Sequence, residues 1–73
     1  MSYAKNFIEY MKNHNIASFT HVDIVIQTGT TCPHSVLRSM KPILNSLGFQ
    51  LREEAEKNKN NSGSHTRYFI EVL

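Results

Sequence analysis

The side chains best suited to catalysis in this 73-residue chain are one cysteine, four histidines and a group of glutamates. Cys32 and His34 stand two positions apart, and a thiol at the start of a helix can have a lowered pKa. The sequence places no third group that would orient such a pair or stabilise an oxyanion beside it. The histidines and the cysteine also lack the paired spacing of a zinc site. We therefore expect neither a catalytic thiol nor a bound metal.

Glu53, Glu54 and Glu56 form the other reactive cluster. Two carboxylates act as general acid and base only inside an enclosed site. A chain of this size buries about 60% of the surface of its unfolded form, which leaves little room for such a pocket. We expect these glutamates to lie on a solvated strand face or an interaction patch. The protein is accordingly predicted to be no enzyme, with no cofactor and no small-molecule substrate.

The basic residues form a more informative pattern than the net charge of +2. Two segments, 31–49 and 57–70, contain basic residues and no acid. Together they contribute Arg38, Lys41, Lys57, Lys59 and Arg67. Such segments bind phosphate groups if the fold places them on one side of the molecule, and otherwise they are ordinary solvated charge.

Caps and apolar spacing predict the helices that must position these residues. Ser2 can cap a first helix of about 2–14, whose apolar residues recur at steps of three and four. Thr20, followed by Asp23, resembles a capping box and predicts a second helix of about 20–28. The β-branched residues of this segment would also suit a strand. We favour a helix, because the cap precedes them and a Thr-Gly-Thr-Thr turn follows.

A third helix is predicted over about 32–47. Thr31 can cap it, Pro33 suits its first turn, and Pro42 should bend it near its middle. The apolar side chains at 36, 37, 40, 44 and 47 would face the other helices. The opposite face would then present His34, Ser35, Arg38, Lys41 and Asn45.

Residues of about 49–73 predict a β-hairpin. Alternating residues from Phe49 to Glu56 and β-forming residues from Tyr68 to Leu73 flank a polar tip. With a short extended connector between the first two helices, the chain is predicted to be one α+β domain over 1–73. No apolar run approaches the roughly 18 residues that a membrane helix needs, and no signal peptide is apparent. One cysteine fits a reducing compartment, so we expect a cytoplasmic protein without a membrane partner.

This order of elements resembles the winged helix-turn-helix domain, with three helices, a short strand and a C-terminal hairpin wing. Residues 19–49 carry the resemblance, with Gly29 in the turn and Pro33 opening the third helix. The phrase Gly29-Thr30-Thr31-Cys32-Pro33-His34, followed by Val36-Leu37, resembles small winged-helix proteins encoded by bacteriophages and prophages.

The resemblance implies a non-enzymatic protein that binds double-stranded DNA, such as a phage or prophage-type transcriptional regulator in a bacterial or phage-infected cell. Its third helix would enter the major groove and its wing would touch the backbone. Arg38 would contact guanine, with His34 and Ser35 near base edges. The phosphate contacts would come from Thr30, Thr31, Lys41, Lys57, Lys59 and Arg67. Asn60 and Asn61 would either reach a minor groove or serve as turn residues.

The alternative is a protein-interaction module on the same fold, for example one that binds a host factor. The low net charge and the glutamate cluster favour this alternative. One copy of so small a domain reads few base pairs, so useful affinity usually needs a homodimer or a protein partner. We expect a monomer, a weak dimer or cooperative binding on DNA.

Overall fold

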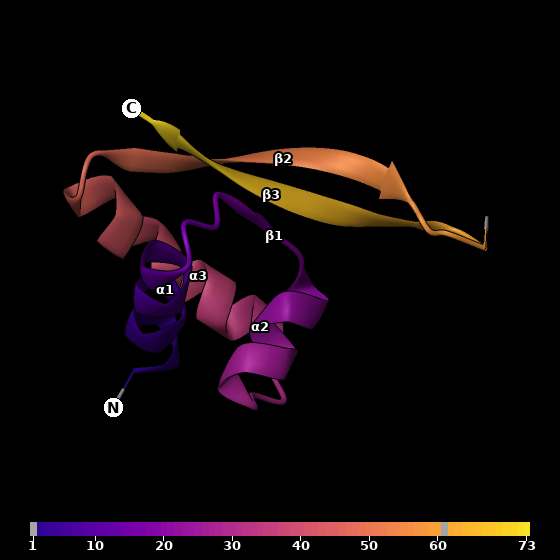
Figure 1. Cartoon of the computed structure of the whole chain (residues 1–73), viewed down its shortest axis with the longest axis horizontal. Helices are drawn as coiled ribbons and strands as arrows, with labels where there is room; N and C mark the ends of the chain where they lie inside the picture. Colours follow the sequence, from indigo (N-terminus) through magenta and orange to yellow (C-terminus); the bar gives the residue numbers. More distant parts are fainter. Residues whose placement is uncertain (1, 61) are drawn as a thin grey trace.

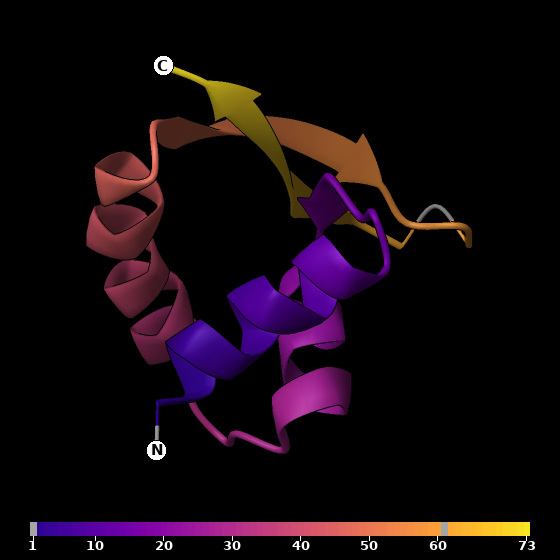
Figure 2. The same cartoon turned by 60° about the vertical axis from the view of Figure 1, so that its left-hand side comes forward.

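The computed structural model describes residues 2–60 and 62–73. Its elements are α1 (Tyr3–Asn13), β1 (Ser18–Phe19), α2 (His21–Thr28), α3 (Pro33–Ser46), β2 (Phe49–Lys57) and β3 (Ser64–Val72) (Figure 1). The strands form one antiparallel sheet in the order β1-β3-β2, and all three helices lie on one side of it (Figures 1 and 2). The predicted α+β class is confirmed. Each predicted helix range differs from the observed one by at most one residue at either end.

Local capping explains where the first two helices begin. The Ser2 hydroxyl accepts a hydrogen bond of 3.3 Å from the Lys5 N–H. The Asp23 carboxylate accepts from the N–H of Thr20 at 2.9 Å and from its hydroxyl at 3.3 Å. Gly29, with a φ of 73°, ends α2 in the left-handed conformation that glycine adopts without strain. These signals outweigh the β propensity of the residues between them, so the predicted helix is confirmed.

Cys32, and not Thr31, occupies the N-cap position of α3. The prediction was wrong because the Thr30 hydroxyl accepts a hydrogen bond of 3.0 Å from the Cys32 N–H, which holds the chain in the loop for one more residue. Pro33 takes the first helical position, where its missing N–H has no partner to lose. The helix then continues through the exposed Pro42 to Ser46.

The hairpin is paired further toward its tip than the sequence predicts. Its register runs from Phe49 opposite Val72 to Lys57 opposite Ser64. The last strand therefore begins at Ser64 instead of Tyr68, because the polar residues that follow Ser64 pair with the charged end of β2. The paired strands extend well beyond the helices (Figure 1).

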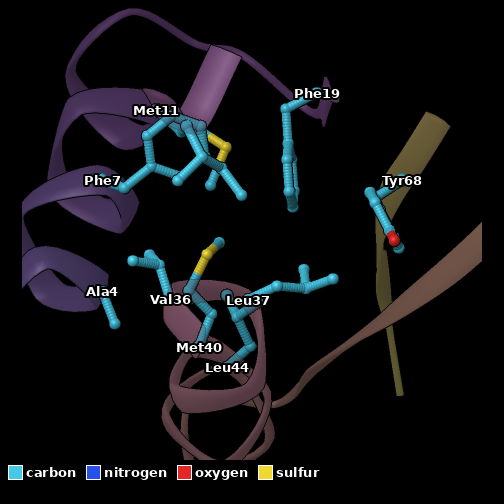
Figure 3. Packing of buried hydrophobic residues seen from close by; sticks show 10 residues of the cluster. Ala4, Phe7, Met11, Phe19, Val36, Leu37, Met40, Leu44 and Tyr68 are labelled. Atoms are coloured by element: carbon cyan, nitrogen blue, oxygen red, sulfur yellow. The ribbon is translucent and has the colours of Figure 1, made fainter. Parts of the chain in front are cut away.

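The core lies between the three helices and the sheet. Phe19 of β1 packs edge-on against Phe7 of α1 with ring centroids 5.2 Å apart, and its ring lies 5.4 Å from that of Tyr68. The buried side chains are Ala4, Phe7, Met11, Phe19, Ile24, Val36, Leu37, Met40, Leu44 and Tyr68, most of which are labelled in Figure 3. Four of them belong to α3, and their burial fixes which face of that helix meets solvent.

Candidate nucleic-acid interface

The solvent face of α3 is polar and basic. It presents His34, Ser35, Arg38, Lys41 and Asn45, all of them exposed as the sequence predicts. The helix contains no acidic residue. Leu47, predicted to be buried with the apolar side chains of this helix, is 59% exposed because α3 ends one residue before it.

One edge of this face lies next to the hairpin. Lys41 and Asn45 line a shallow hollow of about 470 Å³ together with Gln50 and Leu51 of β2 and with Leu73. The basic edge of α3 and the first half of β2 therefore share one side of the molecule.

A cluster of rings joins the start of α3 to α2 and the sheet. The ring of His34 lies against that of His21, with centroids 4.1 Å apart. The Nε2 atom of His21 is 3.3 Å from the hydroxyl oxygen of Tyr68, within hydrogen-bond distance. Burial lowers the pKa of His21 and the nearby His34 lowers it further, against a smaller opposing effect of Glu53. Burial, and then Glu53, raises the pKa of Tyr68.

The loop between α2 and α3 buries one predicted contact residue and exposes another. Thr30 is 7% exposed. Its N–H donates to the Thr28 hydroxyl at 3.2 Å, and its own hydroxyl accepts from the Cys32 N–H. Thr30 therefore shapes the loop from inside, whereas Thr31 is exposed beside the N-terminus of α3.

The two lysines of the wing are exposed. Lys57 is the last residue of β2 and, by alternation, lies on the same face of the strand as Leu51. Lys59 lines a hollow of about 510 Å³ that also includes Thr20 and Val22 at the start of α2. Both lysines thus stand toward the helix side of the hairpin.

Arg67 lies on the other face of the hairpin, which we call the outer face. Tyr68 points into the core, so its neighbour Arg67 points away from the helices. The Glu56 carboxylate accepts from the Nε of Arg67 at 3.0 Å and from its Nη2 at 3.3 Å. It also contacts the Nε2 of His65 at 2.9 Å. These hydrogen bonds, with that of Arg67 the largest cause, lower the pKa of Glu56.

A second ion-pair group on the outer face was not predicted. Arg52 pairs with Glu54, and its Nε donates to Glu71 at 2.7 Å. Its guanidinium lies 4.4 Å from the ring centre of Phe69. The charged residues at positions 52, 54 and 56 of the sequence could have indicated ion pairs on one face of the strand. Which residues of β3 pair with them follows only from the strand register.

Asn60, one of the two predicted minor-groove residues, lies at the hairpin tip. The Asn60 side-chain oxygen accepts from the N–H of Ser62 at 3.2 Å and from its hydroxyl at 2.6 Å, which makes Asn60 a turn residue. Asn61 lies outside the described residues.

Comparisons of the chain with protein-family models, with curated proteins and with solved structures found no match. Across residues 2–60 and 62–73, no helix combines the length and the apolar character that crossing a membrane requires. The same residues contain no group of three or more side chains placed to hold a metal ion.

Proposed function

We propose that this protein is a winged helix-turn-helix protein that binds double-stranded DNA, as a non-enzymatic regulator of the phage or prophage type. The observation that carries the proposal is the acid-free solvent face of α3, which presents Arg38 and Lys41 beside the hairpin. The order α1-β1-α2-α3-β2-β3 with strand order β1-β3-β2 supports it, since it is compatible with the winged-helix arrangement.

In this proposal α3 lies in the major groove. Its 14 residues span about 21 Å, and a helix of ordinary diameter fits that groove. Arg38, in the middle of the exposed face, contacts guanine in a bidentate manner, and Ser35 lies one turn before it. Thr31 stands at the helix N-terminus, where backbone N–H groups favour a phosphate.

The hairpin supplies contacts that position the protein without reading sequence. Lys41 of α3 lies next to β2, and Lys59 lies on the helix side of the hairpin. Lys57 lies on that side by alternation along β2. Thr30 and Arg67 are left out of the proposed interface, because one is buried and the other is paired with Glu56 on the outer face.

The test is fluorescence anisotropy of a labelled random duplex, titrated with the protein at several salt concentrations. Three or four neutralised phosphates predict that log affinity falls against log salt with a slope of about −2.7 to −3.6. Absence of binding at low salt, even with a large excess of protein, would overturn the proposal.

A matched pair of double variants locates the interface. Arg38→Glu with Lys41→Glu reverses two charges on α3 and should lower the affinity by more than about tenfold, with a shallower salt slope. Lys5→Glu with Lys12→Glu makes the same change in net charge on exposed positions of α1 and should have a much smaller effect. Equal losses in both variants would mean that only the overall charge matters.

The second candidate function is a protein-interaction module on the same fold. The observation in its favour is the outer face of the hairpin, where three glutamates pair with two arginines and Arg52 lies over the ring of Phe69. A protein that uses this face would still bind after Arg38→Glu with Lys41→Glu, whereas DNA would not.

A further inference from the structure

Strand β2 forms an open edge of the sheet. In the order β1-β3-β2 it has a neighbouring strand on one side only (Figure 1). It pairs with β3 residue for residue from Phe49 to Lys57, without a bulge, and it contains neither proline nor glycine. Bulges, prolines and short strands keep an edge from pairing with another chain, and charge is a further device. β2 has only charge, so its charges decide which strand can pair with it.

Much of this edge is accessible to another chain. The residues from Arg52 to Lys57 are all exposed. The hairpin also extends well beyond the helices (Figure 1). A second strand can therefore approach this part of β2 without displacing a helix.

Hydrogen bonds at the two ends of the hairpin show which backbone groups of β2 face β3. The Gly48 carbonyl accepts from the N–H of Leu73 at 2.9 Å, and the N–H of Asn58 donates to the Gly63 carbonyl at 3.0 Å. In an antiparallel pair, residues that exchange hydrogen bonds alternate with residues that do not. Since positions 48 and 58 are both bonded, the even-numbered residues of β2 bond to β3.

The odd-numbered residues of β2 therefore turn their backbone N–H and C=O groups to the open side. Ile70, which lies opposite Leu51, fits this alternation, because its N–H points away from β2 and donates to the Ala17 carbonyl at 2.8 Å. Within the described residues, no hydrogen bond uses the backbone groups on the open side of β2. These groups belong to Phe49, Leu51, Glu53, Ala55 and Lys57.

We propose that β2 pairs with β2 of a second copy of this chain, antiparallel and with the two Glu53 residues opposite each other. In this register Phe49 lies opposite Lys57 and Leu51 opposite Ala55, so all nine residues of β2 have a partner. The five outward-facing residues of each copy then form about ten backbone hydrogen bonds, as many as a typical protein interface has. The two sheets become one sheet of six strands.

Charge makes the second copy a suitable partner. On the outer face, the register places Arg52 of each copy opposite Glu54 of the other, and Gln50 opposite Glu56. Opposite charges that face each other directly stabilise an antiparallel pair. Arg52 already lies on this face, where its Nε donates to Glu71. A guanidinium has five N–H groups, so it can also donate to a carboxylate of the second copy.

Shifted registers fit less well. The smallest shift that keeps the outward backbone groups paired is two residues. In one direction it places Arg52 opposite Arg52 of the second copy. In the other direction Arg52 faces Glu56, but Glu54 faces Glu54 and Phe49 loses its partner in the strand. Charge and the length of the overlap together favour the full register.

One pair of like charges remains at the centre of the proposed interface. Glu53 is exposed and would face Glu53 of the second copy. Directly opposed like charges weaken strand pairing. Removing this charge should therefore strengthen the dimer, whereas removing a negative charge elsewhere on the molecule should not.

Disulfide trapping tests the register. Cys32 is the only cysteine, so Cys32→Ser gives a cysteine-free background for Glu53→Cys or Ala55→Cys. Both positions are exposed on the same face of β2. In the proposed register position 53 faces itself within reach of a disulfide, whereas the two positions 55 are offset by four residues, about 13 Å. Mild oxidation should therefore convert Glu53→Cys to a covalent dimer much faster than Ala55→Cys.

Three results of the trapping experiment would overturn the proposal. Equal rates at the two positions would mean that the strands lie parallel or that copies collide at random. A faster reaction at position 55 would mean a different register. No covalent dimer from either variant would mean that the two edges do not meet.

Sedimentation velocity over a concentration series measures the dimer without a cross-link. Glu53→Gln should dimerise more tightly than the wild type, by up to about fivefold. Glu9→Gln, which removes the same charge from an exposed position of α1, is the matched control and should leave the affinity unchanged. Equal affinities of Glu53→Gln and Glu9→Gln, or a wild type that stays monomeric at every concentration, would contradict the proposal.

Ala55→Pro tests the open edge itself. The N–H of Ala55 points to the open side, so proline should spare the pairing of β2 with β3 and block only the second copy. Circular dichroism confirms the fold of this variant, which should be monomeric where the wild type dimerises. A folded Ala55→Pro that still dimerises like the wild type would contradict the proposal; if the variant does not fold, Glu53→Gln decides. These measurements use no DNA, so the inference does not depend on the proposed function.

Discussion

His21 connects the start of α2 with the first turn of α3 and with β3. Its ring lies 4.1 Å from that of His34, centroid to centroid, and close to the Tyr68 hydroxyl. The environment therefore favours neutral His21, since burial and the neighbouring imidazole both lower its pKa. Protonation would place a positive charge on His21 at the point where the two helices meet.

This environment predicts how stability depends on pH. Because the pKa of His21 is lower in the folded chain, the unfolded chain binds more protons as the pH falls below the ordinary value of 6.5. The free energy of unfolding should be constant above that region and decrease below it, until the lowered pKa is passed. Urea unfolding at a series of pH values measures this. The decrease should become smaller in His21→Gln and persist in His14→Gln, which changes an exposed histidine; an unchanged decrease in His21→Gln would contradict the assignment.

At the scale of single residues, the sequence predicted which face of α3 is exposed. It did not predict which side chains form hydrogen bonds or ion pairs with each other. The face of α3 with Arg38 and Lys41 follows from helical spacing alone. The burial of Thr30 and the pairing of Arg67 with Glu56 do not, because each depends on atoms brought together by the fold. A threonine in a turn and an arginine in a strand have the same appearance in the sequence whether they are engaged or free.

At the scale of elements, the helices were predictable because their signals are local. Caps at Ser2 and Thr20 and the stop at Gly29 lie within or next to the helices that they define. The start of β3 at Ser64 was not predictable in this way. Strand ends depend on cross-strand pairing, and polar residues in an extended hairpin carry little signal of their own.

The register of the hairpin separates two cations that the sequence groups together. Lys59 is exposed on the helix side, whereas Arg67 is held by Glu56 on the outer face. Lys59→Gln should therefore weaken DNA binding and reduce the magnitude of the salt slope by about one phosphate contact. Arg67→Gln removes the same charge and should leave both values close to those of the wild type. Anisotropy titrations of the two variants test this prediction. Equal losses of DNA affinity in both variants would place Arg67 in the interface.

At the scale of the whole molecule, a net charge of +2 hides an uneven distribution. The solvent face of α3 has two cations and no acid, whereas the outer face has three glutamates against two arginines. Composition alone could not show this separation, since it depends on which way each residue of β2 points. Any DNA on α3 therefore meets a locally basic surface within a weak overall field.

Substitutions on the two faces should therefore change DNA affinity in two ways, through the long-range field or through direct contacts. The dependence of the affinity on salt concentration distinguishes them. Glu54→Gln with Glu56→Gln removes two negative charges from the outer face and should strengthen DNA binding at low salt by about tenfold or less. The gain should vanish at high salt, because these positions lie on the face turned away from α3 and act only through the screened field.

Removing Arg38 and Lys41 should instead weaken binding at every salt concentration at which binding is measurable, since direct contacts are lost. Affinities of both double variants across a salt series measure the difference. A gain from the glutamine variant that persists at high salt would mean that DNA also contacts the outer face of the hairpin, and the interface would then have to extend around the edge strand β2.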